Sequence, residues 1–180
     1  MTAVVAVVCS HTVMVGVMVM TPVHMHHSGL TLDLVGLVIS VHILGMYAAS
    51  PLMGWLTDRI GPVRVILIGC GILTAALLLA GLGAGGGPLW LTLALGLLGL
   101  GWSAGMIGGS ALLASAVEPA ARTSVQGASD ALMNLSAAAS AATSGVVLGA
   151  AGYPGLAVVA GFFVAPMLVL ALTLAGRGRP

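Results

Sequence analysis

Six apolar runs, each long enough to cross a bilayer as a helix, take up most of this 180-residue chain. A helix rises about 1.5 Å per residue, so about 20 apolar residues cross about 30 Å of hydrocarbon. Charged residues make up 5% of the chain and the mean hydropathy is +1.19, which leaves too little polar surface to face water. The sequence therefore predicts an all-α membrane protein, a single domain over residues 1–180 with six transmembrane helices. We expect these helices over residues 3–21, 34–54, 65–82, 89–113, 125–148 and 156–174.

The five arginines fall in three segments on one side of these runs, and the chain has no lysine. Arg59 and Arg64 lie between the second and third runs, Arg122 lies between the fourth and fifth, and Arg177 and Arg179 follow the sixth. Cytoplasmic loops hold Lys and Arg because moving these residues across the bilayer is costly. We therefore expect a multi-pass protein of the cell membrane with both termini in the cytoplasm.

Small residues are abundant in the expected helices. The chain has 27 glycines, and small residues let helix backbones approach one another in lipid. Glycines also recur at four-residue spacing, in the pairs Gly101 and Gly105, Gly105 and Gly109, and Gly145 and Gly149. We expect these pairs to mark close-packed helix faces.

Several classes of function are disfavoured by the composition. A net charge of +1, without a basic patch interleaved with aromatic residues, offers nothing to attract nucleic acid. Cys9 and Cys70 lie inside expected helices without ligand-like spacing, so we expect free thiols and no cofactor. We find no recognisable arrangement of nucleophile, base and acid, so an enzyme is not expected.

Local signals predict where some helices begin and end. Pro22 and the polar residues after it are expected to end the first helix. Thr31 or Asp33 can cap the second. Thr123 and Gln126 have the spacing of a capping box, which would start the fifth helix.

The turn between the second and third runs carries the pattern G-x8-G-W-L-T-D-R-I-G-P-V-R. Its characteristic residues are Gly45, Gly54, Asp58, Arg59, Gly61 and Arg64. Glycine permits a tight reversal, and a carboxylate at a helix end can accept charge-assisted hydrogen bonds or face the N-terminus of a neighbouring helix. The arginines can pair with carboxylates or lipid phosphates, and a generic positive-inside turn is the alternative interpretation.

This pattern resembles the signature loop of the major facilitator superfamily, which joins the second and third helices of each six-helix half. In that family the loop is a latch between the two halves. The match covers about 20 residues at the corresponding place in the helix count. The family usually has basic residues directly after the last glycine, whereas this chain has Pro62 and Val63, which indicates a weaker latch.

The resemblance implies one six-helix half of a twelve-helix carrier, with the substrate held between the halves near the bilayer midplane. An arginine-containing tail, and a fifth run without the glycine-proline motif of antiporters, make the chain most like the C-terminal half. The implied function is secondary active transport of a small solute, with proton coupling. The implied partners are the lipid bilayer, the solute, and a complementary six-helix half or a second copy, unless the chain is a truncated fragment.

The fifth run holds three polar residues at four-residue spacing, Gln126, Asp130 and Asn134, which places them on one helical face. Asp130 lies about 10 Å beyond Thr123 along the helix axis, which is deep enough to be costly. Intramembrane carboxylates commonly serve transport, so these three residues are candidates for proton coupling or substrate contact. Alternatively, Asp130 lies in a wet vestibule or pairs with Arg122, and Gln126 only caps the helix.

Two histidines lie inside expected helices. His42 shares a face with Gly45 and is either a neutral side chain bonded to a neighbouring helix or a protonatable transport residue. His11 shares a face with Met14 and Met18, which favours a role in packing.

A third group, His24, His26 and His27, follows the first run with Met25 among them. Imidazole and thioether groups suit copper or zinc, but the spacing matches no closed tetrahedral site, so a solvated loop is the favoured interpretation. The alternative to transport for the whole chain is a non-transporting membrane interaction or assembly subunit, whose glycine faces dock a partner.

Overall fold

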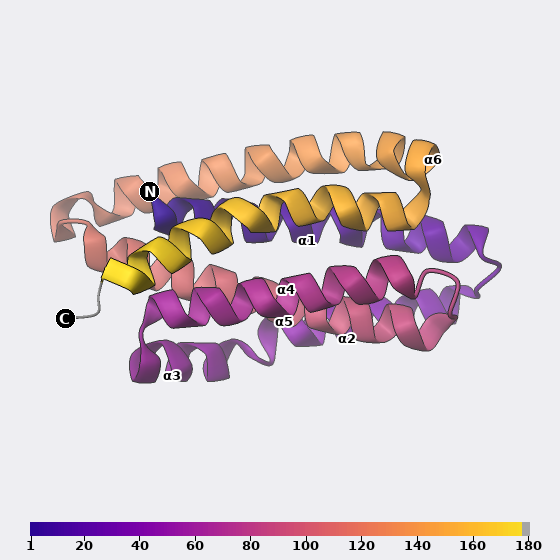
Figure 1. Ribbon diagram of the computed structural model, residues 1–180, viewed down its shortest axis with the longest axis horizontal. Coiled ribbons are helices and arrows are strands. Elements are labelled where there is room, and N and C mark those ends of the chain that lie inside the picture. The colour runs from indigo at the N-terminus through magenta and orange to yellow at the C-terminus, as the bar shows by residue number, and fades with distance from the viewer. Residues whose placement is uncertain (178–180) are drawn as a thin grey trace.

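The computed structural model describes residues 1–177, and these residues form a bundle of long helices (Figure 1). Arg179 lies outside the described residues. The elements are α1 (Thr2–His27), α2 (Leu32–Tyr47), α3 (Ser50–Ile60), α4 (Pro62–Leu82), α5 (Pro88–Ala116), a 3₁₀ turn η1 (Pro119–Ala121) and α6 (Arg122–Arg177). Within this part of the chain, five helical segments are long and apolar enough to cross a membrane, with α2 and α3 counted as one. The expectation of an all-α membrane protein is confirmed.

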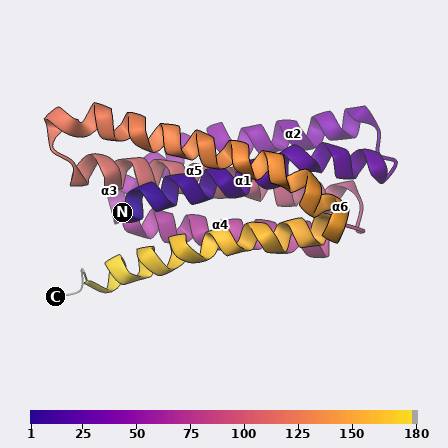
Figure 2. The ribbon, with the colours of Figure 1, turned by 90° about the horizontal axis from the view of Figure 1, so that it is seen from above.

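The longest element, α6, is bent back on itself. Gly152 has a φ of 66° and a ψ of −175°, a backbone conformation open essentially to glycine, and it interrupts the helix. Figures 1 and 2 show α6 running along the bundle, turning, and returning toward the end where it began, with its two parts diverging from the turn. We call residues 122–151 the first segment of α6 and residues 153–177 the second segment.

The helix ends place the arginines together. Arg59 is in the last turn of α3, Arg64 in the first turn of α4, and Arg122 and Arg177 are the first and last residues of α6. The N-terminus, the α3–α4 junction, η1 and the end of α6 all lie at one end of the bundle (Figures 1 and 2). We call this the arginine end. The α1–α2 loop, the α4–α5 loop and the turn in α6 lie at the opposite end.

Glycines on α5 let its neighbours approach closely. A methyl group added at Gly101 would come within 2.8 Å of Leu73 on α4, and one at Gly105 would come within 2.7 Å of Ser10 on α1. Gly109 is equally tight against Val7. Two of the expected glycine pairs therefore mark close-packed faces, as small residues do in membrane helices.

The third pair does not pack inside the chain. Gly145 has Met20 Sδ at 3.9 Å from an added methyl group, and Gly149 has no neighbour within 4 Å among the described residues. Both glycines face outward from the first segment of α6.

Some predicted helix boundaries were wrong. The first helix continues through Pro22 to His27. Proline removes one backbone donor, and membrane helices tolerate this loss because side chains and neighbouring helices satisfy the freed groups. The second helix breaks at Ala48 and Ala49 and resumes to Ile60, six residues beyond the expected end at residue 54.

Of the predicted caps, those at the start of α2 have the expected positions, and Asp33 lies in the first turn. Thr31 is the N-cap of α2 without a side-chain hydrogen bond. Because η1 runs directly into α6, Thr123 lies inside the helix and not at its N-cap, and the Gln126 amide bonds elsewhere. Cys9 and Cys70 are free thiols, as expected.

Candidate functional site

Asp130 is the centre of a polar cluster on the first segment of α6. Gln126 Nε2 donates a hydrogen bond to Asp130 Oδ1 at 3.0 Å, and Asn134 Nδ2 donates to the backbone oxygen of Asp130 at 2.8 Å. Asp130 and Gln126 are half-buried, while Asn134 is exposed. The structure therefore places the three side chains on one face, as their spacing predicts.

A surface cavity of about 520 Å³ opens beside Asp130, between the end of α5 and the start of α6. It is lined by Leu113, Ala114, Val117, Arg122, Thr123, Gln126, Gly127 and Asp130. Arg122 Nε donates to the backbone oxygen of Val117 at 3.2 Å, so the guanidinium and the Asp130 carboxylate have different partners while they share one cavity. The geometry favours the vestibule over the ion pair.

His42 bridges two helices. Its side chain is fully buried, and Nδ1 donates to the Leu95 backbone oxygen on α5 at 2.8 Å. A carbonyl can only accept, so Nδ1 carries a proton and Nε2 of the neutral ring is an acceptor. Nε2 has no hydrogen-bond partner among residues 1–177. The contact supports the interpretation of His42 as a buried residue bonded to a neighbouring helix.

His42 and Asp130 are not brought together. His42 meets α5 at Leu95, whereas the Asp130 cavity meets α5 at Leu113. These positions are 18 residues apart, or about 27 Å along the helix axis. Any role in transport must be separate for the two groups.

His11 is also a link between helices. Trp102 Nε1 on α5 donates to His11 Nδ1 on α1 at 2.9 Å. Tyr47 meets the same indole ring edge-on, with ring centroids 6.0 Å apart. The sequence pointed to packing for His11 but gave no signal for its partner Trp102, which lies 91 positions away.

At the opposite end, His24 in the last turn of α1 contacts both the α4–α5 loop and the turn in α6. Its ring stacks on Tyr153 with centroids 4.4 Å apart and an angle of 8°, and Nε2 donates to the Ala84 backbone oxygen at 3.2 Å. The hydroxyls of Tyr153 and Thr21 are 2.7 Å apart. The Tyr153 side chain is 2% exposed, so this contact is buried.

The histidines after the first apolar run belong to no group of three potential metal ligands in the described part of the chain. His26 and His27 are exposed, with ring centroids 6.4 Å apart, and His24 is engaged as described above. Among the described residues, no three His, Cys, Asp or Glu side chains stand close enough to hold a metal ion.

Of the three glycines of the predicted latch loop, two occupy positions that require glycine. Gly61 has a φ of 88° and joins α3 to α4, so its backbone needs glycine. A methyl group added at Gly45 would come within 2.5 Å of the Gly96 backbone oxygen on α5, so Gly45 is needed for close packing. Gly54 has open space around it.

The charged residues of this loop lie at the arginine end and are exposed. The Arg59 guanidinium carbon lies 5.1 Å from the centroid of the Trp55 ring. Asp58 and Arg64, which belong to the same turn, are also exposed. These groups are available to solvent, lipid headgroups or another chain.

Comparison with known proteins decides the family. The family model of the Major Facilitator Superfamily matches residues 3–180. The chain belongs to this superfamily. The expected membership of this family is thereby confirmed.

Relatives agree over nearly the whole chain. It is 39% identical over 172 residues to the uncharacterized MFS-type transporter YdeG of Bacillus subtilis (strain 168), covering 96% of this chain and 40% of the relative. Identity to YddS of the same organism is 40% over 158 residues, covering 88% and 36%. Identity to the riboflavin transporter RfnT of Brucella anthropi is 33% over 170 residues, covering 94% and 41%. The chain thus spans about two fifths of the length of the curated relatives it matches.

Proposed function

We propose that this chain is one six-helix half of a major-facilitator-type carrier, the C-terminal half, and takes part in secondary active transport of a small solute. The observation that carries the proposal is the family match over residues 3–180, in relatives that are more than twice as long. Half a carrier lacks one wall of the substrate site, so transport requires a complementary half or a second copy. If the chain is a fragment, the missing half belongs to the same polypeptide.

The proposed topology has six crossings, with the arginine end in the cytoplasm of a cell-membrane protein. Five helical segments satisfy the length and hydropathy of a span, and α6 reverses at Gly152, so its two segments would account for two crossings. An even number of crossings puts both ends of the chain on one side, where the arginines cluster.

The proposed docking face for the other half includes α2 and the first segment of α6. Leu37 and Leu44 on α2 are 54% and 66% exposed, and Leu135 and Val146 on α6 are 70% and 74% exposed. Gly145 is open beside Val146 and leaves room for another helix to approach closely. Faces of the bundle that no partner covers would meet lipid.

Asp130 is the proposed proton-coupling residue. A half-buried carboxylate that shares a cavity with Arg122 can take up and release a proton, and Gln126 orients it by a hydrogen bond of 3.0 Å. Gln126 and Asn134 are proposed to contact the solute. His42 remains a second protonatable candidate because its Nε2 is buried without a partner among residues 1–177.

The test of this proposal uses the chain with its complementary half in proteoliposomes that contain a pH-sensitive dye. Riboflavin is the first solute to try, because the relative RfnT is named for it. Solute-driven proton movement is expected, and Asp130→Asn should abolish it. Asp33→Asn is the matched control, since Asp33 is an exposed carboxylate in the first turn of α2. Proton movement that survives Asp130→Asn would contradict the role of Asp130.

The second candidate function is that of a non-transporting assembly subunit. It is favoured by the open space beside Gly145 and Gly149, where a helix of a partner could pack. In that case Asp130→Asn would have no effect, while Gly145→Leu would abolish association with the partner. Gly145→Leu is a clean probe because its nearest neighbour is 3.9 Å away and belongs to a flexible methionine side chain.

A further inference from the structure

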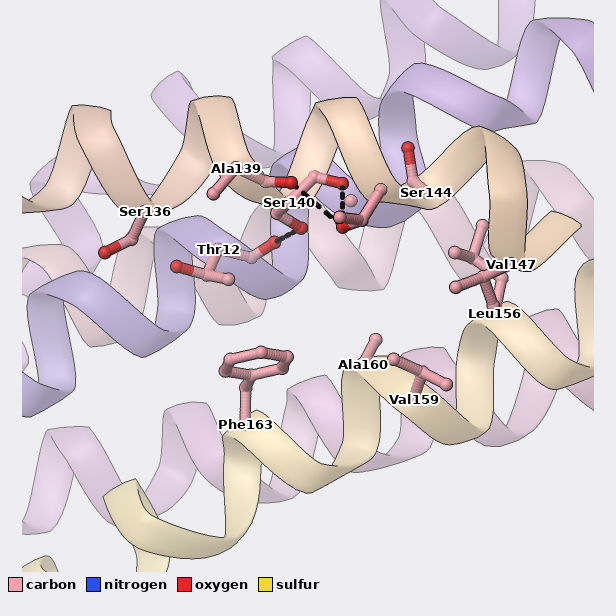
Figure 3. A pocket seen from close by; sticks show the side chains of 12 residues that line it. Thr12, Ser136, Ala139, Ser140, Ser144, Val147, Leu156, Val159, Ala160 and Phe163 are labelled. Atoms are coloured by element: carbon pink, nitrogen blue, oxygen red, sulfur yellow. Dashed lines mark hydrogen bonds between the residues drawn. The ribbon is translucent and has the colours of Figure 1, made fainter.

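A cavity of about 340 Å³ lies between α1 and the two segments of α6 (Figure 3). One wall carries five hydroxyl side chains, from Thr12, Ser136, Ser140, Thr143 and Ser144. The facing wall is apolar, and Phe163 points from the second segment of α6 toward the hydroxyls across the gap (Figure 3). None of the residues that line it carries a charge. Ligand sites are commonly of this size and mix an apolar lining with a few polar groups.

The protons of four of these hydroxyls are already committed. Thr12 donates to the Val8 oxygen at 2.7 Å, and Ser140 donates to the Thr12 oxygen at 3.0 Å. Thr143 donates to the Ala139 oxygen at 2.9 Å, and Ser144 donates to the Ala141 oxygen at 2.8 Å. Each residue has one hydroxyl proton and two lone pairs, so these oxygens are left as acceptors only.

Ser136 is the exception among the five. Within residues 1–177 its hydroxyl makes no hydrogen bond, so it can donate as well as accept. The polar wall therefore consists mainly of acceptors, with one group that can play either role.

We propose that this cavity binds a small neutral molecule with several O–H or N–H donors along one edge and a flat apolar face. The donors would pair with the acceptor oxygens of the hydroxyl wall, and the apolar face would lie against Phe163. An anion is disfavoured because a carboxylate or phosphate offers only acceptors, and Ser136 is the one hydroxyl of this wall with a proton free to donate. A cation would lose its hydration without meeting a charged partner.

The walls of the cavity are held apart by the fold. Because α6 turns at Gly152, its two segments diverge from that residue, and α1 lies between them (Figure 2). At Gly16 the backbone of α1 comes so close to the first segment that an added methyl group would lie 2.5 Å from Ser140 Oγ. This close approach fixes the Ser140 hydroxyl at the wall. Thr143 and Phe163 are exposed, so a ligand can enter from the side.

The test compares two probes built on the same flat ring, 2,7-dihydroxynaphthalene and 2,7-dimethoxynaphthalene. Methylation removes both donors and keeps the flat ring. Binding to the 180-residue chain in lipid nanodiscs is measured by equilibrium dialysis, with the uptake by empty nanodiscs subtracted. The diol should bind at least about 10-fold more tightly than the dimethoxy compound, because an unpaired buried acceptor is costly. Equal binding of the two compounds would overturn the proposal.

Substitutions at the lining residues test whether the diol binds in this cavity. Thr143→Val keeps the shape of the side chain, removes one acceptor, and should raise the Kd of the diol about 3- to 10-fold. Thr173→Val is the matched control, since Thr173 makes the same kind of bond to its own helix at Leu170 outside the cavity. Ala139→Leu adds bulk at an exposed lining position and should abolish binding without disturbing the core. Unchanged binding in both cavity variants would refute the assignment.

This proposal is independent of the transport role. Asp130 lies outside the cavity, so Asp130→Asn should leave the Kd of the diol unchanged. A failure of proton coupling would therefore not affect the result.

Discussion

The contacts of Tyr153 with Thr21 and His24, at the end opposite the arginine end, predict the size of a stability loss. Thr21 Oγ1 donates its proton to the Val17 oxygen at 2.9 Å, so the 2.7 Å bond between Thr21 and Tyr153 must be donated by the tyrosine. Tyr153→Phe removes this donor and keeps the ring that stacks on His24. A single buried hydrogen bond contributes about 0.5–1.5 kcal/mol in water-soluble proteins and a similar amount between membrane helices. We expect a loss of about 1 kcal/mol in the free energy of unfolding.

The assay is unfolding of the chain in mixed micelles with increasing sodium dodecyl sulfate, followed by circular dichroism. Tyr47→Phe is the control, because Tyr47 is 62% exposed and meets Trp102 through its ring. A double-mutant cycle with Thr21→Val isolates the pair, and its interaction energy should equal most of the loss. Equal stability of Tyr153→Phe and Tyr47→Phe, or an interaction energy near zero, would refute the reasoning.

Five further substitutions, two of them controls, test helix packing and backbone strain by the same unfolding measurement. Gly105→Leu should destabilise the chain by about 3 kcal/mol or more, because the side chain would meet Ser10, whereas Gly149→Leu should be neutral in its open surroundings. Gly61→Ala should cost about 1–3 kcal/mol because of its φ of 88°, while Gly54→Ala, in a helix with free space, should cost nothing. Trp102→Phe should cost about 1 kcal/mol through the lost bond to α1. A reversal of the order within either glycine pair, or no change at Trp102, would contradict these contacts.

The sequence predicted features that depend on local pattern. The apolar runs located the helices, because hydrocarbon thickness sets their length. Four-residue spacing placed Gln126 and Asn134 on the face of Asp130, and the charge pattern placed the described arginines at one end. The signature loop was found because its residues lie close together in the sequence, and one of them, Gly61, has a conformation that needs glycine.

Features that depend on distant partners were missed. Nothing near Tyr153 in the sequence points to Thr21, which lies 132 positions away. The capping box at Thr123 failed because the preceding 3₁₀ turn continues into the helix, which the local spacing cannot reveal. The hydroxyl cavity was missed for the same reason, since it forms where α1 meets a helix that folds back at Gly152.

The measurement that tests the account most directly is the sidedness of single cysteines in intact cells. Cys9 and Cys70 are first replaced by alanine, and then Asp58→Cys, Gly176→Cys and Ser28→Cys are made separately at exposed positions. A membrane-impermeant maleimide added outside should label residue 28 and spare residues 58 and 176 until the cells are opened. Labelling of residues 58 and 176 from opposite sides would contradict an even number of crossings and, with it, the assignment as half a carrier.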